Sequence, residues 1–198
     1  MRVDAVVLAA GASRRFGGGS KLLAEVAGRP LLRRVAEAVA ASRAEEILVV
    51  VPPDAGGLRE ALAGLPLRVV ENLHHAAGMG ASIASGVRAL DPACEAALIV
   101  PGDLPGLTAQ LIDRLIAVLE ADSGRPIVYA ATAAGAQRNP VLWPRRHFHR
   151  LAALAGEAGG KAILAEQTHE TRAVPVADES QLADVDTPED LAAFLGSR

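Results

Sequence analysis

The sequence has 198 residues, of which 51% are hydrophobic and 3% aromatic, and its formal net charge is −3 at pH 7. This length and aliphatic content fit one domain over residues 1–198, while scarce aromatic and scattered basic residues argue against a nucleic-acid partner. The single cysteine, Cys94, excludes an internal disulfide and indicates a reducing compartment. No apolar run approaches the roughly 20 residues of a membrane span, and the N-terminal run is typical of a strand, not a signal peptide. We therefore expect a cytoplasmic protein without a membrane partner.

Short apolar runs alternate along the chain with longer segments of helical periodicity. Runs typical of strands buried on both faces lie at residues 4–10, 45–51, 67–71, 95–100, 126–131 and 171–176. Apolar residues recur at helical spacing at Leu32, Val35 and Val39, at Ile83, Val87 and Leu90, and at Leu111, Leu115 and Leu119. The sequence from Thr187 has the cap, the proline and the acidic first turn of a further helix. The alternation predicts a three-layer α/β/α, Rossmann-like fold with a mostly parallel sheet.

Sheets of this kind bind ligands at the carboxyl ends of their strands, so polar residues that follow a strand are candidates for a site. The first such stretch is LAAGASRRFGGGSKLL, at residues 8–23. The backbone amides of residues 11–13 can form an anion-binding nest, and the side chains of Arg15 and Lys21 can reach phosphates. The residues that flank the lysine exclude a P-loop, and a missing third glycine excludes a dinucleotide fingerprint. A solvated glycine-rich loop with incidental cations is the alternative.

Two later stretches place carboxylates where a metal site needs them. Asp103 follows a buried strand in VPGDLPGLT (residues 100–108), and a carboxylate opposite a phosphate loop suits Mg²⁺. Asp184 and Asp186 alternate in ADVDTPEDL (residues 183–191), so we expect only one of them, Asp186, to face the site. The alternatives are a turn role for Asp103 and a helix-capping role for Asp186.

Four segments in this order resemble one family over essentially the whole chain: LAAGASRRFGGGSKLL, VPGDLPGLT, RNPVLWP (138–144) and DVDTPEDLAAF (184–194). They are similar to the molybdopterin nucleotidyltransferases, the MobA-like NTP transferases, which share the fold of the nucleotide-diphospho-sugar transferases. LAAG and GDLP resemble the molybdenum cofactor cytidylyltransferase branch, where the guanylyltransferase branch usually has LAGG and CD-x-P. NLHHAAGMGASIASGV (72–87) also resembles the cytidylyl-type segment that closes over the base and substrate.

The resemblance implies a Mg²⁺-dependent enzyme that transfers CMP from CTP to the phosphate of molybdopterin and releases pyrophosphate. The implied catalytic residues are Lys21, Arg15 and Asp103, with Lys21 stabilising charge at the α-phosphate. Asp103 and Asp186 would bind Mg²⁺, and Asn139 and Lys161 would bind the acceptor. The implied nucleotide-binding residues are Leu8, Ala9, Ala10, Gly11, Ala12, Ser13, Gly78, Gly80, Ser82 and Gly102.

The chain also departs from the family pattern. Lys21 lies one residue further from Gly17 than in many members, and Asn139 stands where histidine is often found. In GEAGGKAIL (156–164), Glu157, Gly160 and Lys161 replace the family's Asp, Ala and Arg. The acceptor therefore stays open. A phosphorylated sugar, polyol or organic acid is one alternative, and a nucleotide-cofactor carrier or insertion chaperone, with a molybdoenzyme as its partner, is another.

The remaining candidates have a structural interpretation. A phosphate-monoester nucleophile is already mostly dianionic at neutral pH, so the reaction does not require a histidine. We expect solvated positions for His74, His75, His147 and His149, and a packing role for Trp143. The alternatives are contact with a ligand for His74 and His75, and metal binding for His147 and His149.

Overall fold

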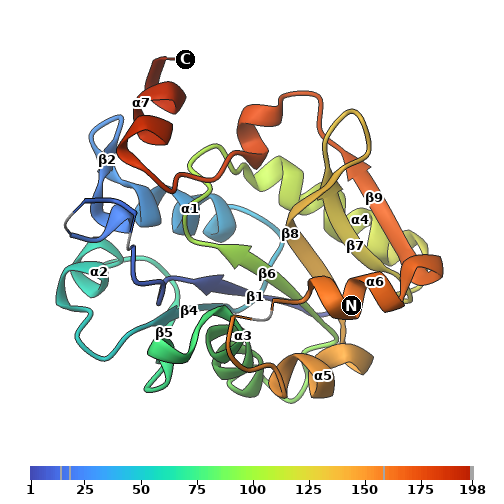
Figure 1. The fold of residues 1–198 in the computed structure, drawn as a ribbon. Coiled ribbons are helices and arrows are strands. Elements are labelled where there is room, and N and C mark those ends of the chain that lie inside the picture. The colour runs from blue at the N-terminus through green and yellow to red at the C-terminus, as the bar shows by residue number, and fades with distance from the viewer. Residues whose placement is uncertain (14, 18, 158, 197–198) are drawn as a thin grey trace.

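The computed structural model describes residues 1–13, 15–17, 19–157 and 159–196, so Arg14, Gly18 and Ala158 of the sequence motifs lie outside the described residues. Its main feature is a seven-stranded sheet in the order β5-β4-β1-β6-β8-β7-β9 (Figure 1). The strands are β1 (Val3–Leu8), β4 (Ile47–Val51), β5 (Arg68–Glu71), β6 (Ala96–Pro101), β7 (Ile127–Ala131), β8 (Gln137–Pro144) and β9 (Thr171–Pro175). All of these strands except β8 run in one direction. The predicted α/β class with a mostly parallel sheet is confirmed.

The six predicted strands are all present, with ends shifted by one or two residues. β8 is not among the six runs predicted as strands, and it lies antiparallel between β6 and β7. Pro140 and Pro144 lie in β8, and proline within an apolar run argues against an internal strand. A small antiparallel hairpin of β2 (Glu25–Val26) and β3 (Arg29–Pro30) was likewise not predicted from the sequence.

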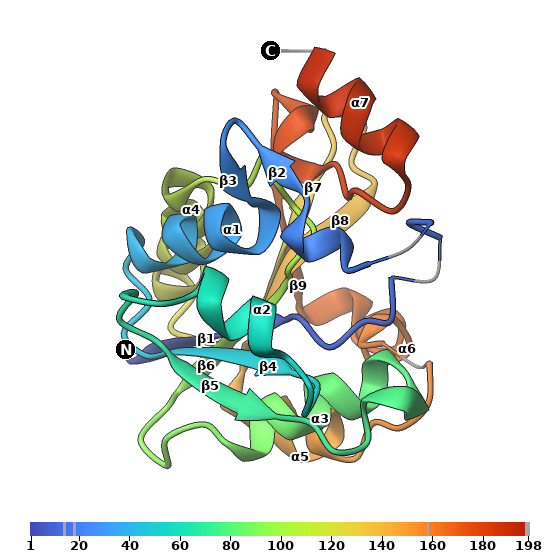
Figure 2. The same cartoon turned by 90° about the vertical axis from the view of Figure 1, so that its left-hand side faces the viewer.

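Helices cover both faces of the sheet, and Figure 2 shows α1 and α4 on one side and α3 and α5 on the other. One buried cluster joins the sheet to α1 (Leu31–Ala40), α2 (Gly56–Ala61), α4 (Ala109–Ala121) and α7 (Pro188–Gly196). A second buried cluster joins the opposite face to α3 (Met79–Arg88), α5 (Phe148–Ala152) and α6 (Lys161–Glu166). The predicted third layer is therefore present. The expected helix around Ile83 ends at Arg88, before Leu90.

Helix starts follow the capping chemistry of the sequence. The Thr108 side chain caps α4 by accepting a hydrogen bond from the Leu111 amide at 3.2 Å. The remaining short elements are 3₁₀ turns: η1 (Lys21–Leu23), η2 (His75–Ala77), η3 (Arg145–His147), η4 (Thr168–Glu170) and η5 (Glu179–Leu182). Three of them, η1, η2 and η5, contribute residues to the candidate site described below.

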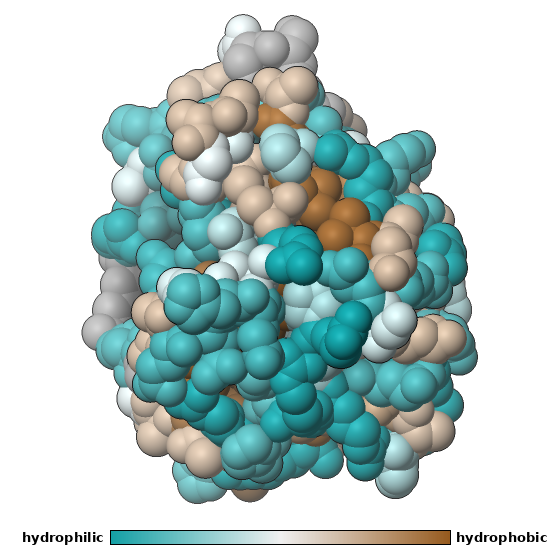
Figure 3. Space-filling view, turned by 90° about the vertical axis from the view of Figure 1, so that its right-hand side faces the viewer, coloured by the Kyte–Doolittle hydropathy of each residue, from teal (hydrophilic) through white to brown (hydrophobic). Residues whose placement is uncertain are grey.

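Hydrophilic side chains cover most of the face at the β9 end of the sheet, with a confined apolar patch among them (Figure 3). Within the described residues, no helix combines the length and the apolar character that crossing a bilayer requires.

Candidate active site

A cavity of about 670 Å³ opens at the carboxyl ends of the parallel strands. Its wall contains fourteen of the sixteen residues that the sequence analysis assigned: Leu8, Ala10, Gly11, Ala12, Ser13, Arg15, Lys21, Gly78, Ser82, Gly102, Asp103, Asn139, Lys161 and Asp186. Two assigned residues lie off this wall. Ala9 is buried, and the Gly80 amide donates to the Gly156 carbonyl at 2.9 Å. The amide of Gly80 is therefore engaged within the protein.

The first two strand ends meet closely because β1 and β6 are neighbours in the sheet. Leu8 pairs with Pro101, and the Gly102 amide donates to the Leu8 carbonyl at 2.9 Å. A β-carbon at Gly102 would lie 2.8 Å from the Leu8 carbonyl oxygen, which is too close for any side chain. Glycine at this position therefore allows the two segments that carry Lys21 and Asp103 to leave the sheet side by side.

Lys21 is positioned by the turn that contains it. Its amide donates to the Ser13 side chain at 3.2 Å, which ties the end of the glycine-rich loop back to its beginning. The next residue, Leu22, is buried in the core cluster beneath α1. Ser13 has a φ of 48°, in the left-handed region that residues other than glycine rarely adopt. These contacts hold the lysine at the cavity wall.

The Lys21 ammonium group lies between two carboxylates from distant parts of the chain. Its Nζ atom is 2.6 Å from Oδ2 of Asp103 and 2.7 Å from Oδ1 of Asp186. The two carboxylate oxygens are thus no more than about 5 Å apart, the total of these two bonds. Only 12% of the Lys21 side chain is exposed. Arg15, which is largely exposed, contacts the other oxygen of Asp186 at 2.7 Å.

Backbone contacts fix both carboxylates. The Val185 amide donates to the Asp103 carbonyl at 3.0 Å, which joins the segment after β6 to the segment before α7. The Asp186 amide donates to the Asp190 side chain at 3.0 Å, at the first turn of α7. Asp184 also lines the cavity, which corrects the expectation that only Asp186 of the pair would face the site.

Burial and the contact between Lys21 and the carboxylates have opposite effects on the pKa values of Lys21 and Asp103. Burial would lower the pKa of Lys21, but the adjoining carboxylates of Asp103 and Asp186 outweigh it and raise that pKa above its usual range. Burial raises the pKa of Asp103, and the neighbouring Lys21 offsets this only in part, while Asp184 raises it further. The Oδ1 atom of Asp103 is buried and has no hydrogen-bond partner within the described protein. An unpaired buried carboxylate oxygen is costly, so this atom is suited to a cationic ligand.

A second wall of the cavity comes from the segment between β5 and α3. Asn72, which is fully buried, donates to the Ser82 hydroxyl at 3.1 Å and accepts from the His74 amide at 2.9 Å. Gly78 begins α3 with a φ of 108°, and a β-carbon there would lie 2.5 Å from the Gly156 carbonyl oxygen. The sequence therefore builds this wall from a tightly bonded amide and a glycine that no other residue can replace without strain.

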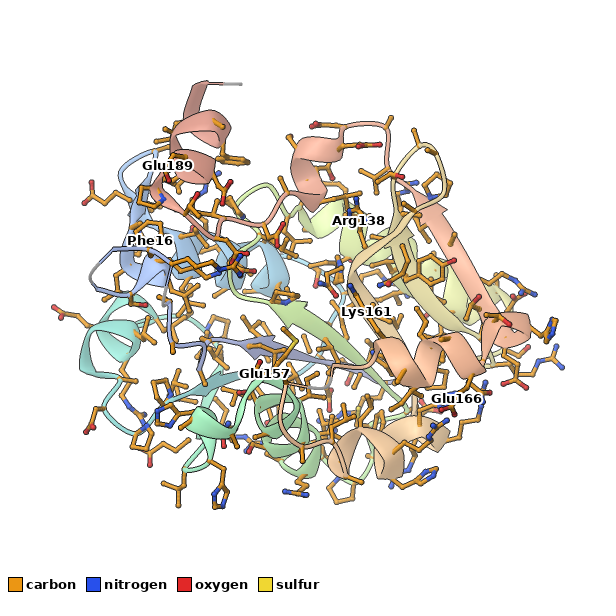
Figure 4. All side chains as sticks on the ribbon, in the orientation of Figure 1. Phe16, Arg138, Glu157, Lys161, Glu166 and Glu189 are labelled. Carbon is orange, nitrogen blue, oxygen red and sulfur yellow. The ribbon has the colours of Figure 1, made fainter. Side chains whose placement is uncertain are left out.

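The opposite end of the cavity carries two cations. Arg138 on β8 and Lys161 at the start of α6 both line it, beside Asn139 and Glu157 (Figure 4). Neither Arg138 nor Lys161 forms an ion pair with another described residue, in contrast to Arg15 and Lys21 at the first end. This end is therefore suited to an anionic or polar group of a ligand.

The histidines divide between two environments. The expectation of a solvated position is wrong for His147, which is 5% exposed and packs edge-on against Trp143 with ring centroids 6.1 Å apart. Burial lowers its pKa, because the charged ring loses hydration. His75 lines the cavity. Trp143 is buried in the second cluster, so its predicted packing role is confirmed.

A family model described as the MobA-like NTP transferase domain matches residues 5–172. The chain belongs to this family. Its membership supports a nucleotidyltransferase that uses a nucleoside triphosphate. The match begins within β1 and ends at the start of β9, so it includes Lys21 and Asp103, while Asp186 lies beyond it.

Two full-length relatives carry different names. Molybdenum cofactor guanylyltransferase from Cereibacter sphaeroides is 32% identical over 197 residues, which cover 97% of this chain and 95% of that protein. Nicotine blue oxidoreductase from Paenarthrobacter nicotinovorans is 29% identical over 202 residues, covering 98% and 96% of the two chains. The relatives thus share the family and differ in the activities they are named for.

Solved structures of one mycobacterial protein are also similar. The crystal structure of Rv0371c from Mycobacterium tuberculosis H37Rv has a TM-score of 0.84 and 26% identity, and the match covers 100% of both chains. A manganese complex of Rv0371c has a TM-score of 0.79 and 24% identity, again over 100% of both chains. That related protein therefore binds a divalent metal ion.

Several residues of the wall were given no role from the sequence, including Gln137 and two residues of the quoted motifs, Arg138 and Glu157. Arg138 immediately precedes Asn139, which was assigned to the acceptor, so its neighbour in RNPVLWP was the available signal. No comparable signal marks Gln137, because its place depends on β8 joining the sheet.

Proposed function

We propose that this protein transfers CMP from CTP to the phosphate group of molybdopterin, with release of pyrophosphate. The observation that carries the proposal is the contact of Lys21 with both Asp103 and Asp186 beneath the glycine-rich loop. A lysine ammonium group, two carboxylates and the backbone amides of residues 11–13 together suit a nucleoside triphosphate and its metal ion. We place the activity in the cytoplasm, because a lone buried cysteine suits a reducing compartment.

The bond changes follow from the chemistry of the two substrates. An oxygen of the acceptor phosphate forms a bond to the α-phosphorus of the nucleotide, and the bond from that phosphorus to the β-phosphate oxygen breaks. Pyrophosphate leaves with the electron pair of the broken bond. The acceptor oxygen needs no general base, because the second pKa of a phosphate monoester is about 6. The protein therefore contributes positioning and charge.

The residues at the end of the cavity that contains Lys21 each have a role in this transfer. The amides of Gly11, Ala12 and Ser13 and the guanidinium group of Arg15 would bind the triphosphate. Lys21 would stabilise the charge that shifts at the α-phosphate in the transition state. The low exposure of Lys21 strengthens this effect, because water screens a buried charge poorly.

The residues present also fit a divalent metal ion. Asp103 presents a buried Oδ1 atom without a partner, and Asp186 presents a second carboxylate about 5 Å away or closer. Mg²⁺ usually binds one or two carboxylates of the protein, and substrate phosphates and water complete its coordination. Asp103 and Asp186 would hold the ion. When bound, Mg²⁺ neutralises phosphate charge.

The choice of base and acceptor rests on different support. LAAG at 8–11 and GDLP at 102–105 favour CTP, whereas the relatives named guanylyltransferases favour GTP. Arg138 and Lys161, which line the cavity without an ion pair to another described residue, support an acceptor that carries polar or anionic groups beyond the reacting phosphate. The molybdenum cofactor is the acceptor in the name of one relative, and the acceptor that we propose here is its pterin, molybdopterin.

The test is a pyrophosphate-release assay with each of the four nucleoside triphosphates, MgCl₂ and a set of acceptors. Release with CTP and molybdopterin supports the proposal, and Lys21→Ala and Asp103→Ala should each lower kcat by about 10²-fold or more. Release with GTP and molybdopterin would overturn the base assignment. Release only with a sugar, polyol or organic-acid phosphate would overturn the acceptor. A protein that binds nucleotide but releases no pyrophosphate with any acceptor would be a carrier.

A further inference from the structure

The carboxylates of the site are already occupied by cations of the protein itself. Lys21 contacts Oδ2 of Asp103 and Oδ1 of Asp186, and Arg15 contacts Oδ2 of Asp186. Of the four carboxylate oxygens, only Oδ1 of Asp103 lacks a partner in the described structure. The two negative charges are thus matched by the two positive charges of Lys21 and Arg15.

The two cations differ in how firmly they are held. The side chain of Arg15 is 71% exposed, so water and salt screen its single contact with Asp186. The side chain of Lys21 is 12% exposed and makes two short contacts at once. Breaking a buried ion pair is costly unless the displaced charge finds another partner. Lys21 therefore determines whether the carboxylate pair accepts another cation.

We propose that the Lys21 ammonium group is an internal cation that competes with a divalent metal ion for Asp103 and Asp186. This inference rests on the proposed function for the identity of the metal site. Lys21 leaves the carboxylates when the metal ion binds, and the substrate's phosphates offer the anionic partner that the released ammonium group needs. The protein should consequently bind metal weakly alone and much more tightly together with nucleotide.

The competing interpretation is a permanent ion pair, in which Lys21 stays on both carboxylates whatever else binds. In that case the metal ion would rely on Oδ1 of Asp103 alone, and binding of the metal ion would leave the Lys21 ammonium group as inaccessible as before. The two interpretations therefore differ in whether a metal ion releases Lys21 in the wild type.

The first experiment measures binding of MnCl₂ to the full chain without nucleotide, from the electron paramagnetic resonance signal of free Mn²⁺. Lys21→Met should bind Mn²⁺ about tenfold more tightly than the wild type, because it leaves two carboxylates without their cation. Lys161→Met is the matched control, since it removes the same charge from the same cavity without touching Asp103 or Asp186. We expect the control to change the affinity by less than about threefold.

The second experiment uses the wild type and so does not depend on a variant that folds. Lys21 and Lys161 are the only lysines in the sequence, so an amine-reactive reagent followed by mass spectrometry reports on them separately. Adding MnCl₂ should increase the labelling of Lys21 relative to Lys161. In the first experiment, Lys21→Gln serves as a second variant for the measurement of Mn²⁺ affinity.

An Mn²⁺ affinity of Lys21→Met and Lys21→Gln that equals or falls below that of the wild type would overturn the proposal. An unchanged labelling ratio at saturating MnCl₂ would overturn it as well. Neither result depends on pyrophosphate release. Failure of the competition and failure of the nucleotidyl transfer are therefore distinguished by separate measurements.

Discussion

Asp190 holds the backbone of Asp186, because its carboxylate accepts hydrogen bonds from the amides of Asp186 at 3.0 Å and Thr187 at 2.8 Å. The Thr187 hydroxyl accepts in return from the Asp190 amide at 3.1 Å, which completes a capping box at the start of α7. These bonds lower the pKa of Asp190 below its usual range. The cap of a helix thereby orients a residue of the candidate site.

Asp190→Ala should lower the rate of pyrophosphate release by about tenfold, because a small displacement of a site residue can have a large effect on rate. Glu189→Ala is the control. Glu189 lies in the same turn, but the amides of Asp186 and Thr187 donate to Asp190 and not to the Glu189 carboxylate. The rates are measured at saturating nucleotide. Equal rates for Asp190→Ala and Glu189→Ala would show that the cap does not position Asp186.

The buried amide of Asn72 should be needed for both stability and nucleotide binding. It contacts the hydroxyls of Ser82 and Ser85 and the amide of His74. Asn72→Ala leaves these groups without partners, and we expect the free energy of unfolding in urea to fall by about 1–3 kcal/mol. Because Ser82 lines the cavity, the KM for the nucleotide should rise as well.

Ser85→Ala is the matched control for Asn72→Ala. It removes one hydrogen bond of Asn72, at 3.2 Å, and Ser85 is not among the described residues that line the cavity. We expect a smaller loss of stability and an unchanged KM. A KM for the nucleotide that is unchanged in Asn72→Ala would show that this amide does not position the cavity wall for nucleotide binding.

Much of the site could be predicted because it lies directly after buried strands. The apolar runs that became β1 and β6 end at Leu8 and Pro101, and residues 11–13 and Asp103 follow these two ends within five positions. Parallel neighbours in a sheet bring such ends together, so the proximity of the glycine-rich loop to Asp103 follows from the pattern. Local residue order was sufficient at these two positions.

Other features depend on contacts that residue order does not reveal. Lys21 and Asp186 meet although 165 positions separate them, and Asp186 follows no strand of the sheet. β8 enters antiparallel despite two prolines, which brings Arg138 and Asn139 to the cavity. His147 is buried because its short turn packs onto Trp143, and a one-turn segment has too little periodicity to show which side is buried.

Gly86 on α3 should tolerate no larger residue. A β-carbon there would collide with Val6 of β1 and lie 3.0 Å from a methyl group of Val50 on β4. Gly86→Ala should lower the free energy of unfolding by about 1–3 kcal/mol, because overpacking outweighs the better helix propensity of alanine. Gly56→Ala in α2 is the control, since outside its own helix the added group would meet no described atom within 4 Å. Equal urea midpoints for the two variants would contradict the close approach of α3 to the sheet.

The thiol of Cys94 should be inert in the folded protein. The side chain is fully buried and donates to the Ala96 carbonyl at 3.2 Å, and burial raises the pKa of the thiol to about 12. Because the thiolate is the reactive form, reaction with a disulfide reagent at pH 8 should be slower than in urea by about a hundredfold or more. Glutathione under the same conditions serves as the reference. A native protein that reacts as fast as the unfolded chain would show that Cys94 is accessible.

The ion pairs of Lys21 should give the stability a characteristic dependence on alkaline pH. Burial alone would lower the pKa of Lys21, but Asp103 and Asp186 raise it above its ordinary value of 10.5, so the folded state binds this proton more tightly than the unfolded state. The resulting stabilisation is fully present below pH 10.5 and is lost as the pH rises through the folded-state pKa.

The measurement compares the free energy of unfolding in urea for the wild type and Lys21→Met across this range. The wild type should be more stable by an amount that stays constant from about pH 7 to 9 and shrinks above the ordinary pKa of lysine. Lys161→Met is the control, because Lys161 pairs with no carboxylate in the described part of the chain, so this variant removes a lysine charge and keeps both ion pairs of Lys21. A wild-type advantage that persists unchanged at pH 11 would mean that Lys21 does not stabilise the fold through its charge.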